Sequence, residues 1–241
     1  MLIGYIDGIK TLSGVLDVPH IPEPPEPEQT DYYYGDFLTN YTVMTDEPQI
    51  GVIDALIIED KLYTRADKIR LNGNQYIDTG YAPTNHTKIK VDFTHSISEN
   101  KFLFGSRTNG SSSDAFGFLY NSGVTYAMFG SSQSSVATRV TADERHTVTL
   151  SQEGCMLDNI PIKSFSEMSF TSALPIYIGG MNQNGSISNR IFEGEIYGVR
   201  LYENNRLVRY MLPFTEHSSG AVYLYDFIGH TLYDPAVVSS P

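Results

Sequence analysis

The sequence predicts an all-β protein, a sandwich of two antiparallel sheets. Three observations support this fold class. Short apolar runs recur after about residue 69, and turn signals separate them about every eight to twelve residues. Within the runs, apolar and polar residues alternate as in a strand with one buried face. Helical periodicity is nearly absent from the chain.

The first 30 residues read as an anchor followed by a spacer. An apolar stretch over residues 1–18 precedes Ile21–Gln29 (IPEPPEPEQ), where prolines and glutamates predict an extended polyproline-type segment. Asp7 and Asp17 interrupt the apolar stretch and no basic region precedes it, so it does not read as a signal peptide. No run in the chain reaches the roughly 18 apolar residues of a membrane span. The spacer would tether residues 1–20 at a distance, and we expect these residues to dock on another subunit.

Residues 31–68 predict a β-rich connecting segment. Ile50–Ile58 and the following Leu-Tyr-Thr read as a hairpin with its turn at Glu59 to Lys61. The run Tyr32–Tyr34 is interpreted as part of a strand rather than as a contact patch, because tyrosine favours strands.

Residues 69–241 carry the main β domain. In Thr87–Thr94 the apolar Ile89, Val91 and Phe93 alternate with charged residues, which predicts one buried and one wet face. Similar runs follow down to AVYLYDF near the C-terminus. For residues 205–212 (NRLVRYML) the pattern allows either a short helix or a strand.

The net charge argues against one class of partner, and the cysteine content indicates the redox environment in which the protein folds. The chain has 16 Lys and Arg against 28 Asp and Glu, a net charge of −12, which argues against nucleic acid as a partner. Cys155 is the single cysteine, so no internal disulfide can form, and we expect it to be a small buried apolar side chain. These features suit a protein made in a reducing cytoplasm.

Three local patterns resemble one family. Asp143–Ile162 reads as a strand, a turn at Gln152–Gly154, a return strand and a second turn at Asp158–Asn159. Pro175–Glu203 reads as a strand ending in two glycines, a polar loop and a longer strand, and Asn72–Phe93 resembles an opening strand pair. In this order they are similar to concanavalin A-like and laminin G-like jelly rolls, above all to those attached to structural proteins of tailed bacteriophages.

The resemblance implies a jelly-roll domain over residues 69–241 and a role in the virion. The expected function is that of a head fibre, tail or baseplate protein, made in the bacterial host cytoplasm, which binds host-surface carbohydrate. Other virion subunits would hold it through its N-terminal segment. A homo-oligomer is expected, with a trimer as the guess, although no heptad or collagen-like repeat supports one. An architectural capsid or tail decoration protein that binds no sugar is the alternative.

An enzymatic role is the least expected reading. Related jelly rolls with glycosidase activity carry two catalytic carboxylates on one strand, and the nearest stretch here is Glu193-Gly-Glu195-Ile-Tyr197. Alternation puts these three side chains on one face, but Tyr197 stands where the second catalytic carboxylate should be. We therefore predict that the chain is not an enzyme and that Glu193 and Glu195 lie on a wet strand face.

Polar loops and nearby tyrosines are the expected sugar-binding groups, because amides, arginine and aromatic rings suit hydroxyl-rich ligands. The loops are predicted at Ser106–Asp114, Gly130–Ser135 and Met181–Arg190. The chain has no tryptophan, so tyrosine would supply the aromatic faces. The candidate ligand-binding residues are Tyr120, Tyr126, Tyr177, Asn182, Gln183, Asn184, Asn189 and Arg190.

No cofactor is indicated, and a metal site stays open. The six histidines show no metal-binding spacing, and His146 alternates with Val148, which predicts a core or rim position. A Ca²⁺ ion is implied only by the resemblance, and its ligands are unknown. Asp78, Asp114 and Asp158 are the candidates, and each is more simply explained as a turn or cap residue.

Overall fold

The computed structural model describes residues 2–6, 9–13, 54–96, 100–109, 113–121, 124–136 and 140–238, the first two segments as backbone. The chain divides into two compact units, Met1–Arg65 with Thr215–Ala221, and Ala66–Phe214 with Val222–Pro241. The predicted spacer at Ile21–Gln29 and the strand at Tyr32–Tyr34 lie outside the described residues.

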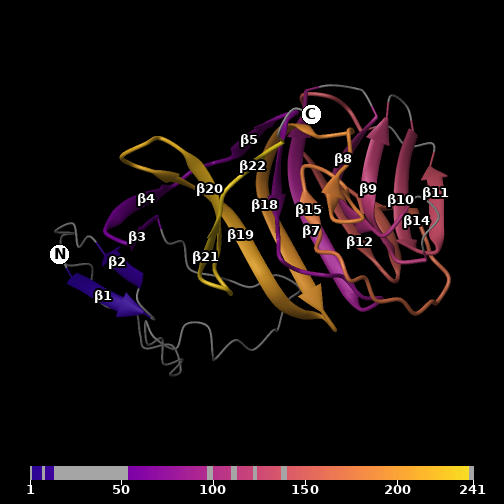
Figure 1. Ribbon diagram of the computed structural model, residues 1–241, viewed down its shortest axis with the longest axis horizontal. Helices are drawn as coiled ribbons and strands as arrows, with labels where there is room; N and C mark the ends of the chain where they lie inside the picture. Colours follow the sequence, from indigo (N-terminus) through magenta and orange to yellow (C-terminus); the bar gives the residue numbers. More distant parts are fainter. Residues whose placement is uncertain are drawn as a thin grey trace, which may run out of the picture. The chain divides into compact units, whose positions relative to one another are not determined.

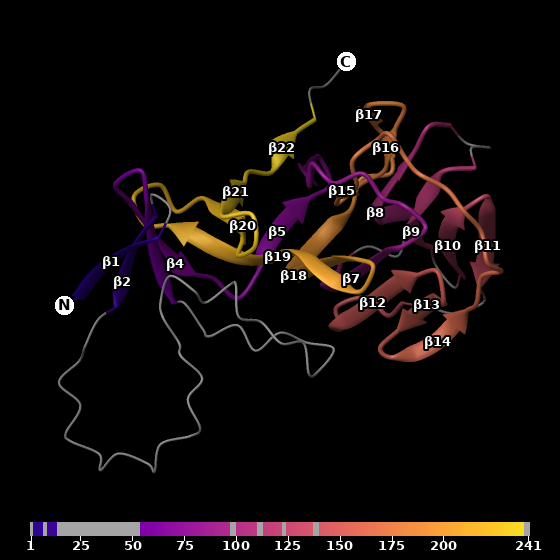
Figure 2. The same cartoon turned by 90° about the horizontal axis from the view of Figure 1, so that it is seen from below.

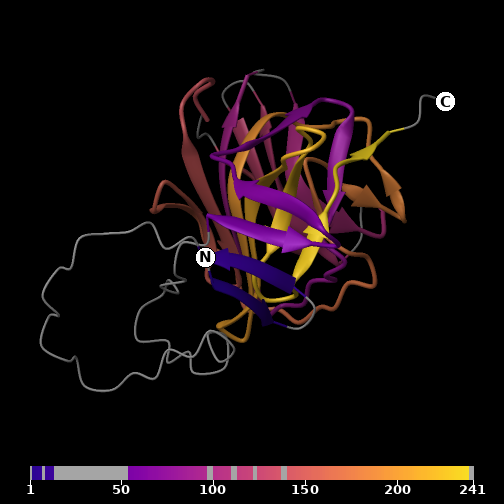
Figure 3. The ribbon, with the colours of Figure 1, turned by 90° about the vertical axis from the view of Figure 1, so that its left-hand side faces the viewer.

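The first unit contains a ladder of four antiparallel strands, visible in indigo and purple in Figure 3. They are β1 (Leu2–Ile6), β2 (Ile9–Ser13), β3 (Ala55–Ile58) and β4 (Lys61–Arg65). The predicted hairpin is confirmed, with its turn at Glu59 and Asp60, which both adopt positive φ. Leu56 and Tyr63 face each other across β3 and β4 and are both buried.

One sheet of the second unit has the order β19-β18-β7-β12-β13-β14, with β5 also paired to β18 and β20-β21 attached to β19 (Figure 1). We call it the first sheet. Its strands are β5 (Ile69–Asn72), β7 (Thr87–His95), β12 (His146–Ser151), β13 (Gly154–Leu157), β14 (Ile160–Lys163), β18 (Glu193–Glu203), β19 (Arg206–Glu216), β20 (Val222–Asp226) and β21 (Thr231–Tyr233).

The other sheet, the second sheet, has the order β11-β10-β9-β8-β15-β6-β22. Figure 2 shows β8 to β11 in one layer and β12 to β14 in the other. Its strands are β6 (Gln75–Asp78), β8 (Lys101–Arg107), β9 (Ala115–Asn121), β10 (Val124–Gly130), β11 (Ser132–Val136), β15 (Tyr177–Ile178), β16 (Asn182–Gln183), β17 (Ser186–Ile187) and β22 (Ala236–Val237). The short β16 runs parallel to β8, and the remaining pairs are antiparallel.

The core lies between the inner faces of these two sheets, as in other aligned sandwiches. Ile89, Val91 and Phe93 of β7 are fully buried, and every second residue between them is half-buried, so the predicted alternation is confirmed. The second sheet supplies aromatic side chains such as Phe116 and Phe129. The described part of the chain is all-β and holds no helix long and apolar enough to cross a membrane.

The hairpins read from the sequence are present. The β13–β14 turn is Asp158–Asn159, and both residues adopt positive φ, which Asp and Asn tolerate better than most residues. His146 is buried at the rim, where its Nδ1 lies 2.7 Å from Asp158 Oδ2. Cys155 is buried as predicted, and burial raises the pKa of its thiol to about 12.

Two local predictions are decided by the structure. Residues 206–216 form strand β19, so the strand reading of 205–212 is confirmed and the helix reading is wrong. The predicted loop Gly130–Ser135 is mostly strand β11, so that prediction was wrong. Gly130 adopts a φ of 57°, which turns the chain so tightly that the following serines pair with β10.

Candidate functional site

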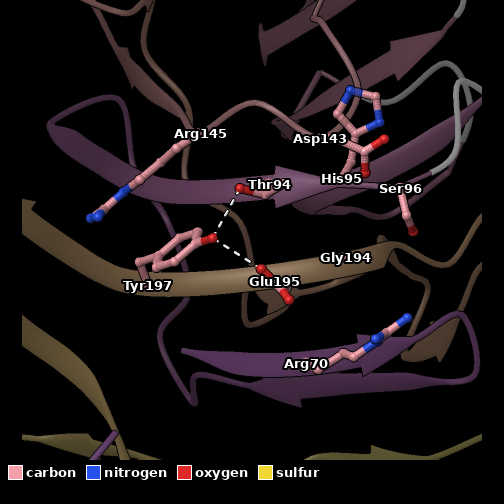
Figure 4. Close-up of a pocket in the computed structure, with 9 residues that line it drawn as sticks. All are labelled: Arg70, Thr94, His95, Ser96, Asp143, Arg145, Gly194, Glu195 and Tyr197. Atoms are coloured by element: carbon pink, nitrogen blue, oxygen red, sulfur yellow. Dashed lines mark hydrogen bonds between the residues drawn. The ribbon is translucent and has the colours of Figure 1, made fainter. Parts of the chain in front are cut away.

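A polar pocket of about 360 Å³ opens on the outer side of the first sheet, where β5, β18 and β7 adjoin (Figure 4). The strand residues with half-buried or exposed side chains here are Arg70, Thr94, Glu195 and Tyr197, and their neighbours along each strand are buried. The pocket is lined by Arg70, Thr94, His95, Ser96, Asp143, Arg145, Gly194, Glu195 and Tyr197.

Strand β18 has a β-bulge at Tyr197, which lines this pocket. Ile196 pairs with Phe93 and Gly198 pairs with Asp92, so Tyr197 is an extra residue with no partner in β7. Bulges redirect side chains, and they are frequent beside binding and catalytic sites. Alternation along β18 puts the tyrosine ring on the same side as Glu195, and the bulge shifts the pairing of the residues that follow.

A chain of hydrogen bonds fixes the ring and the carboxylate. The Tyr197 hydroxyl donates to Glu195 Oε2 at 2.9 Å and lies 3.1 Å from Thr94 Oγ1 (Figure 4). The Lys68 ammonium contacts Glu195 Oε1 at 2.7 Å. The bonds from Lys68 and Tyr197 lower the pKa of the Glu195 carboxyl, against the opposing effect of partial burial. Glu195 is thus a fixed, ionised acceptor at neutral pH.

Two arginines flank the β18 segment that carries Glu195 and Tyr197 (Figure 4). The guanidinium carbon of Arg145 lies 4.2 Å from the centre of the Tyr197 ring, and its Nη2 lies 3.6 Å from Asp92 Oδ2. Arg70 stands directly opposite Glu195 in the β5–β18 register. The Arg145 side chain is 59% exposed, so it can turn toward a ligand at little cost.

The remaining wall consists of His95 and the turn before β12. His95 is fully buried, its Nε2 lies 3.2 Å from the Val140 carbonyl oxygen, and its ring packs on Tyr120 at 4.3 Å. The Asp143 amide donates to the His95 carbonyl oxygen at 2.9 Å, and Asp143 adopts a φ of 62°. The hydrogen bond to His95 fixes the backbone of Asp143, which lines this side of the pocket.

The groups that line the pocket are of kinds that bind polar ligands. Arginine groups donate hydrogen bonds, Glu195 accepts them, and Tyr197 adds an aromatic ring. A glycosidase needs a carboxylic acid that stays protonated near neutral pH. Glu195 has the opposite property, because its pKa is lowered. Glu195 is therefore not held as the protonated acid of such a pair.

None of the residues predicted to bind sugar lines this pocket, and all of them lie around the second sheet. Tyr120 and Asn182 are each 1% exposed and Tyr177 is 7% exposed, so none of the three presents a face to solvent. The Asn182 amide instead donates to the Pro175 carbonyl oxygen and accepts from the Gly185 amide.

The predicted loops Ser106–Asp114 and Met181–Arg190 do come together, because β16 pairs with the end of β8. Arg107 Nη2 donates to Gln183 Oε1 at 2.8 Å, so the amide oxygen of this predicted sugar-binding residue already accepts a hydrogen bond within the protein. The candidates with exposed side chains are Tyr126, Asn184, Asn189 and Arg190.

The sequence reasoning missed Arg70, Thr94 and Arg145. Thr94 lies on the solvent-facing side of the alternating run in β7, and this alternation was the one sequence pattern that could have indicated it. Nothing local in the sequence marks Arg70 or Arg145, since they reach the pocket only through strand register and a loop.

The three aspartates considered for a metal act as turn residues. Asp78 accepts from the Gly80 amide at 2.8 Å, Asp114 accepts from the Thr108 amide at 3.1 Å, and Asp158 accepts from the Thr147 amide at 2.7 Å. Among the described residues, no three His, Cys, Asp or Glu side chains gather as a metal site would require.

Comparison with known proteins shows similarity in structure only. No family model matches the chain, and no curated protein matches its sequence. A solved structure of a proposed carbohydrate-binding protein from Bacteroides ovatus matches at a TM-score of 0.51 and 13% identity. The match covers 73% of this chain and 61% of the Bacteroides protein, and it establishes the sandwich fold.

Two further solved structures are more distant. Domains LG4-5 of the mouse laminin α1 chain match at a TM-score of 0.44 and 15% identity, over 84% of this chain and 60% of that one. The CBM40 of Ruminococcus gnavus IT-sialidase, bound to α2,3-sialyllactose, matches at a TM-score of 0.44 and 13% identity. That match covers 57% of this chain and 90% of the CBM40 chain. None of these three proteins comes from a bacteriophage.

Proposed function

We propose that the second unit is a carbohydrate-binding module and that the pocket around Tyr197 holds the sugar. The observation that carries this proposal is the pre-formed group of an aromatic ring, an ionised carboxylate and two arginines on one sheet face. Sugar hydroxyls bind such mixed donors and acceptors in pairs, while C–H faces pack on aromatic rings.

Pre-organisation is the main physical support. Glu195 and Tyr197 are held by each other, by Lys68 and by Thr94, so a ligand would not have to order them. Ordering a side chain costs about 0.5–1.5 kcal/mol, which a rigid site avoids. A shallow pocket of about 360 Å³ suits one or two sugar units better than an enclosed cofactor.

Binding of the full-length chain to a glycan array is the test, followed by titration calorimetry on any glycan retained. We expect Tyr197→Ala and Arg70→Ala each to weaken binding at least about tenfold, the loss of one good polar or aromatic contact. Both side chains are partly exposed, so the variants should fold, which circular dichroism can check.

Arg190→Ala is the matched control, since this exposed arginine lies on the Met181–Arg190 loop beside the second sheet. It should bind like the wild type. If Arg190→Ala abolishes binding while Tyr197→Ala does not, the site is the loop and not the pocket. A folded chain that retains no glycan would reject carbohydrate binding altogether.

We also propose that the chain is a bacteriophage structural protein whose jelly roll faces outward. The support is the order of the three sequence patterns and the Pro- and Glu-rich spacer at Ile21–Gln29, which suits a tether. Mass spectrometry of purified phage particles should then detect the chain at a stoichiometric level. Its absence from particles would reject this role. A covered pocket in the assembled particle would favour the architectural alternative.

A further inference from the structure

We propose that His146 is a positioning residue of the pocket, and that binding at the pocket weakens when rising pH removes the second ring proton of this histidine. This inference rests on the proposed function and adds a pH dependence to it. Two residues that line the pocket, Asp143 and Arg145, lie just before His146 in the chain. We call residues 141–145 the pocket turn.

The His146 ring closes the pocket turn. Its Nε2 lies 3.0 Å from the carbonyl oxygen of Thr141, the first residue of the turn. Its Nδ1 lies 2.7 Å from Asp158 Oδ2, between β13 and β14. Asp158 is itself fixed, because its Oδ1 accepts from the Thr147 amide at 2.7 Å. His146 is 7% exposed, so water cannot easily replace either contact of the ring.

Both ring nitrogens of His146 therefore face acceptors. A carbonyl oxygen and an ionised carboxylate cannot donate, so each contact needs an N–H on the ring. Neutral imidazole has one N–H and imidazolium has two, so only the protonated ring makes both hydrogen bonds. When one proton leaves, the remaining N–H stays with Asp158, because hydrogen bonds to charged acceptors are stronger than those to neutral ones. The contact with Thr141 is then lost.

Loss of that contact loosens the part of the chain that carries two pocket residues. The middle of the pocket turn is held by the Asp143 amide, which donates to the His95 carbonyl oxygen at 2.9 Å. His95 Nε2 lies 3.2 Å from the carbonyl oxygen of Val140, just before the turn. Without the Thr141 contact, Asp143 and Arg145 would be less restricted, and a ligand that orders them would bind more weakly.

Asp158 is the charged partner of the His146 ring. Among the described residues it is the one acid within ion-pair distance of this ring. Asp92 of β7 accepts from the Thr147 hydroxyl instead, at 2.5 Å. Burial raises the pKa of the Tyr120 hydroxyl across the core, so it stays uncharged where histidine titrates. The other titratable or charged groups on the elements around the ring are His95 of β7 and the exposed Asp143, Glu144 and Arg145 of the pocket turn.

Hydrogen exchange of the full-length chain, followed by NMR, tests the pocket turn without a ligand. The amide of Asp143 is the probe, because its bond to His95 breaks when the turn opens. Its protection factor should fall at least about fivefold between pH 5.5 and 8, the equivalent of about one hydrogen bond. The Asn184 amide, bonded to the Arg107 carbonyl oxygen, is the control and should keep its protection. An unchanged factor at Asp143 would overturn the proposal.

Calorimetry with the glycan that the array retains most strongly tests the effect on binding. Affinity should fall at least about threefold over the same pH range, in which carboxyl groups of ordinary pKa stay ionised. In His146→Gln the side-chain amide can donate to Thr141 at every pH, so this variant should bind equally at pH 5.5 and 8. His86→Gln, at an exposed position, is the matched control and should keep the wild-type pH dependence.

Asp158→Asn is a second variant that should fold, since the side chain is 44% exposed and asparagine tolerates its φ of 53°. It removes the charge that favours imidazolium, so protection and affinity should fall at a lower pH than in the wild type. The proposal is wrong if His146→Gln keeps the wild-type pH dependence, or if Asp158→Asn does not move it. If no glycan binds but the Asp143 amide loses protection as expected, the proposed function fails and the control of the pocket turn by His146 is supported.

Discussion

Replacing Asp226 with alanine should lower the free energy of unfolding by about 3 kcal/mol. The Asp226 side chain is fully buried at the end of β20. Its Oδ1 accepts from the Tyr210 amide at 2.9 Å and from the Ile228 amide at 3.0 Å. Its Oδ2 lies 3.3 Å from Arg209 Nε. Alanine leaves two buried amides without an acceptor, at about 1–3 kcal/mol each. Urea denaturation monitored by circular dichroism measures the loss.

Asp226→Asn is the control, because its amide oxygen can still accept from both backbone amides. It should lose less than half as much stability as the alanine variant. Burial raises the pKa of the Asp226 carboxyl, while the backbone amides and Arg209 lower it. With a raised folded pKa, the contribution of this acid is present below the unfolded pKa of about 3.9 and is lost as pH rises through the folded value. The deficit of the asparagine variant should therefore shrink as pH rises above about 4. A loss below about 1 kcal/mol for Asp226→Ala would contradict the assigned role.

Replacing Glu203 with alanine should cost about 3 kcal/mol. This half-buried carboxylate at the end of β18 accepts from three hydroxyls, two in the segment before β7 and one on the first residue of β7. They are Tyr81 at 3.0 Å, Thr84 at 2.7 Å and Thr87 at 2.8 Å. Hydrogen bonds to a charged group are worth about 1.5–3 kcal/mol each, and solvent can replace part of that loss at a partly exposed position. Thermal and urea unfolding of the full-length variant test this prediction.

The pH dependence of stability at Tyr81 tests whether its hydrogen bond to Glu203 stabilises the fold, as distinct from packing alone. Burial and the bond to Glu203 raise the pKa of the Tyr81 hydroxyl from 10.0 to about 12. The stability from this hydroxyl is present below pH 10 and is lost as pH rises through about 12. The difference in stability between the wild type and Tyr81→Phe should therefore shrink between pH 10 and 12. A constant difference across this window, or an unchanged stability of Glu203→Ala, would show that the bond contributes nothing.

Local features of the fold could be read from the sequence because their causes are local. The alternation over Thr87–Thr94 predicts the buried face of β7, and Asp158–Asn159 predicts a turn through tolerance of positive φ. The wrong loop prediction at Gly130–Ser135 arose because local composition was the only guide there. A serine-rich segment has loop composition, but pairing with β10 satisfies its backbone and overrides that preference.

The site could be predicted only in part. The sequence placed Glu195 and Tyr197 on one strand face, which the structure confirms through their hydrogen bond. It did not predict the bulge at Tyr197, because a bulge depends on how β18 pairs with β7. The sugar-binding candidates Tyr120 and Asn182 were chosen by residue type and position in a loop or strand end, and burial excludes both from solvent.

By itself, the sequence determined the all-β class, several strands and turns, and the negative net charge of the whole chain, since each follows from neighbouring residues or from composition. Only the tertiary structure decided which residues form the pocket and that the His146 ring contacts both Asp158 and Thr141. Arg70, Thr94 and Glu195 are distant in the chain, and they become neighbours because antiparallel register aligns β5, β18 and β7. Register is a property of strand pairs, so one strand's sequence does not contain it.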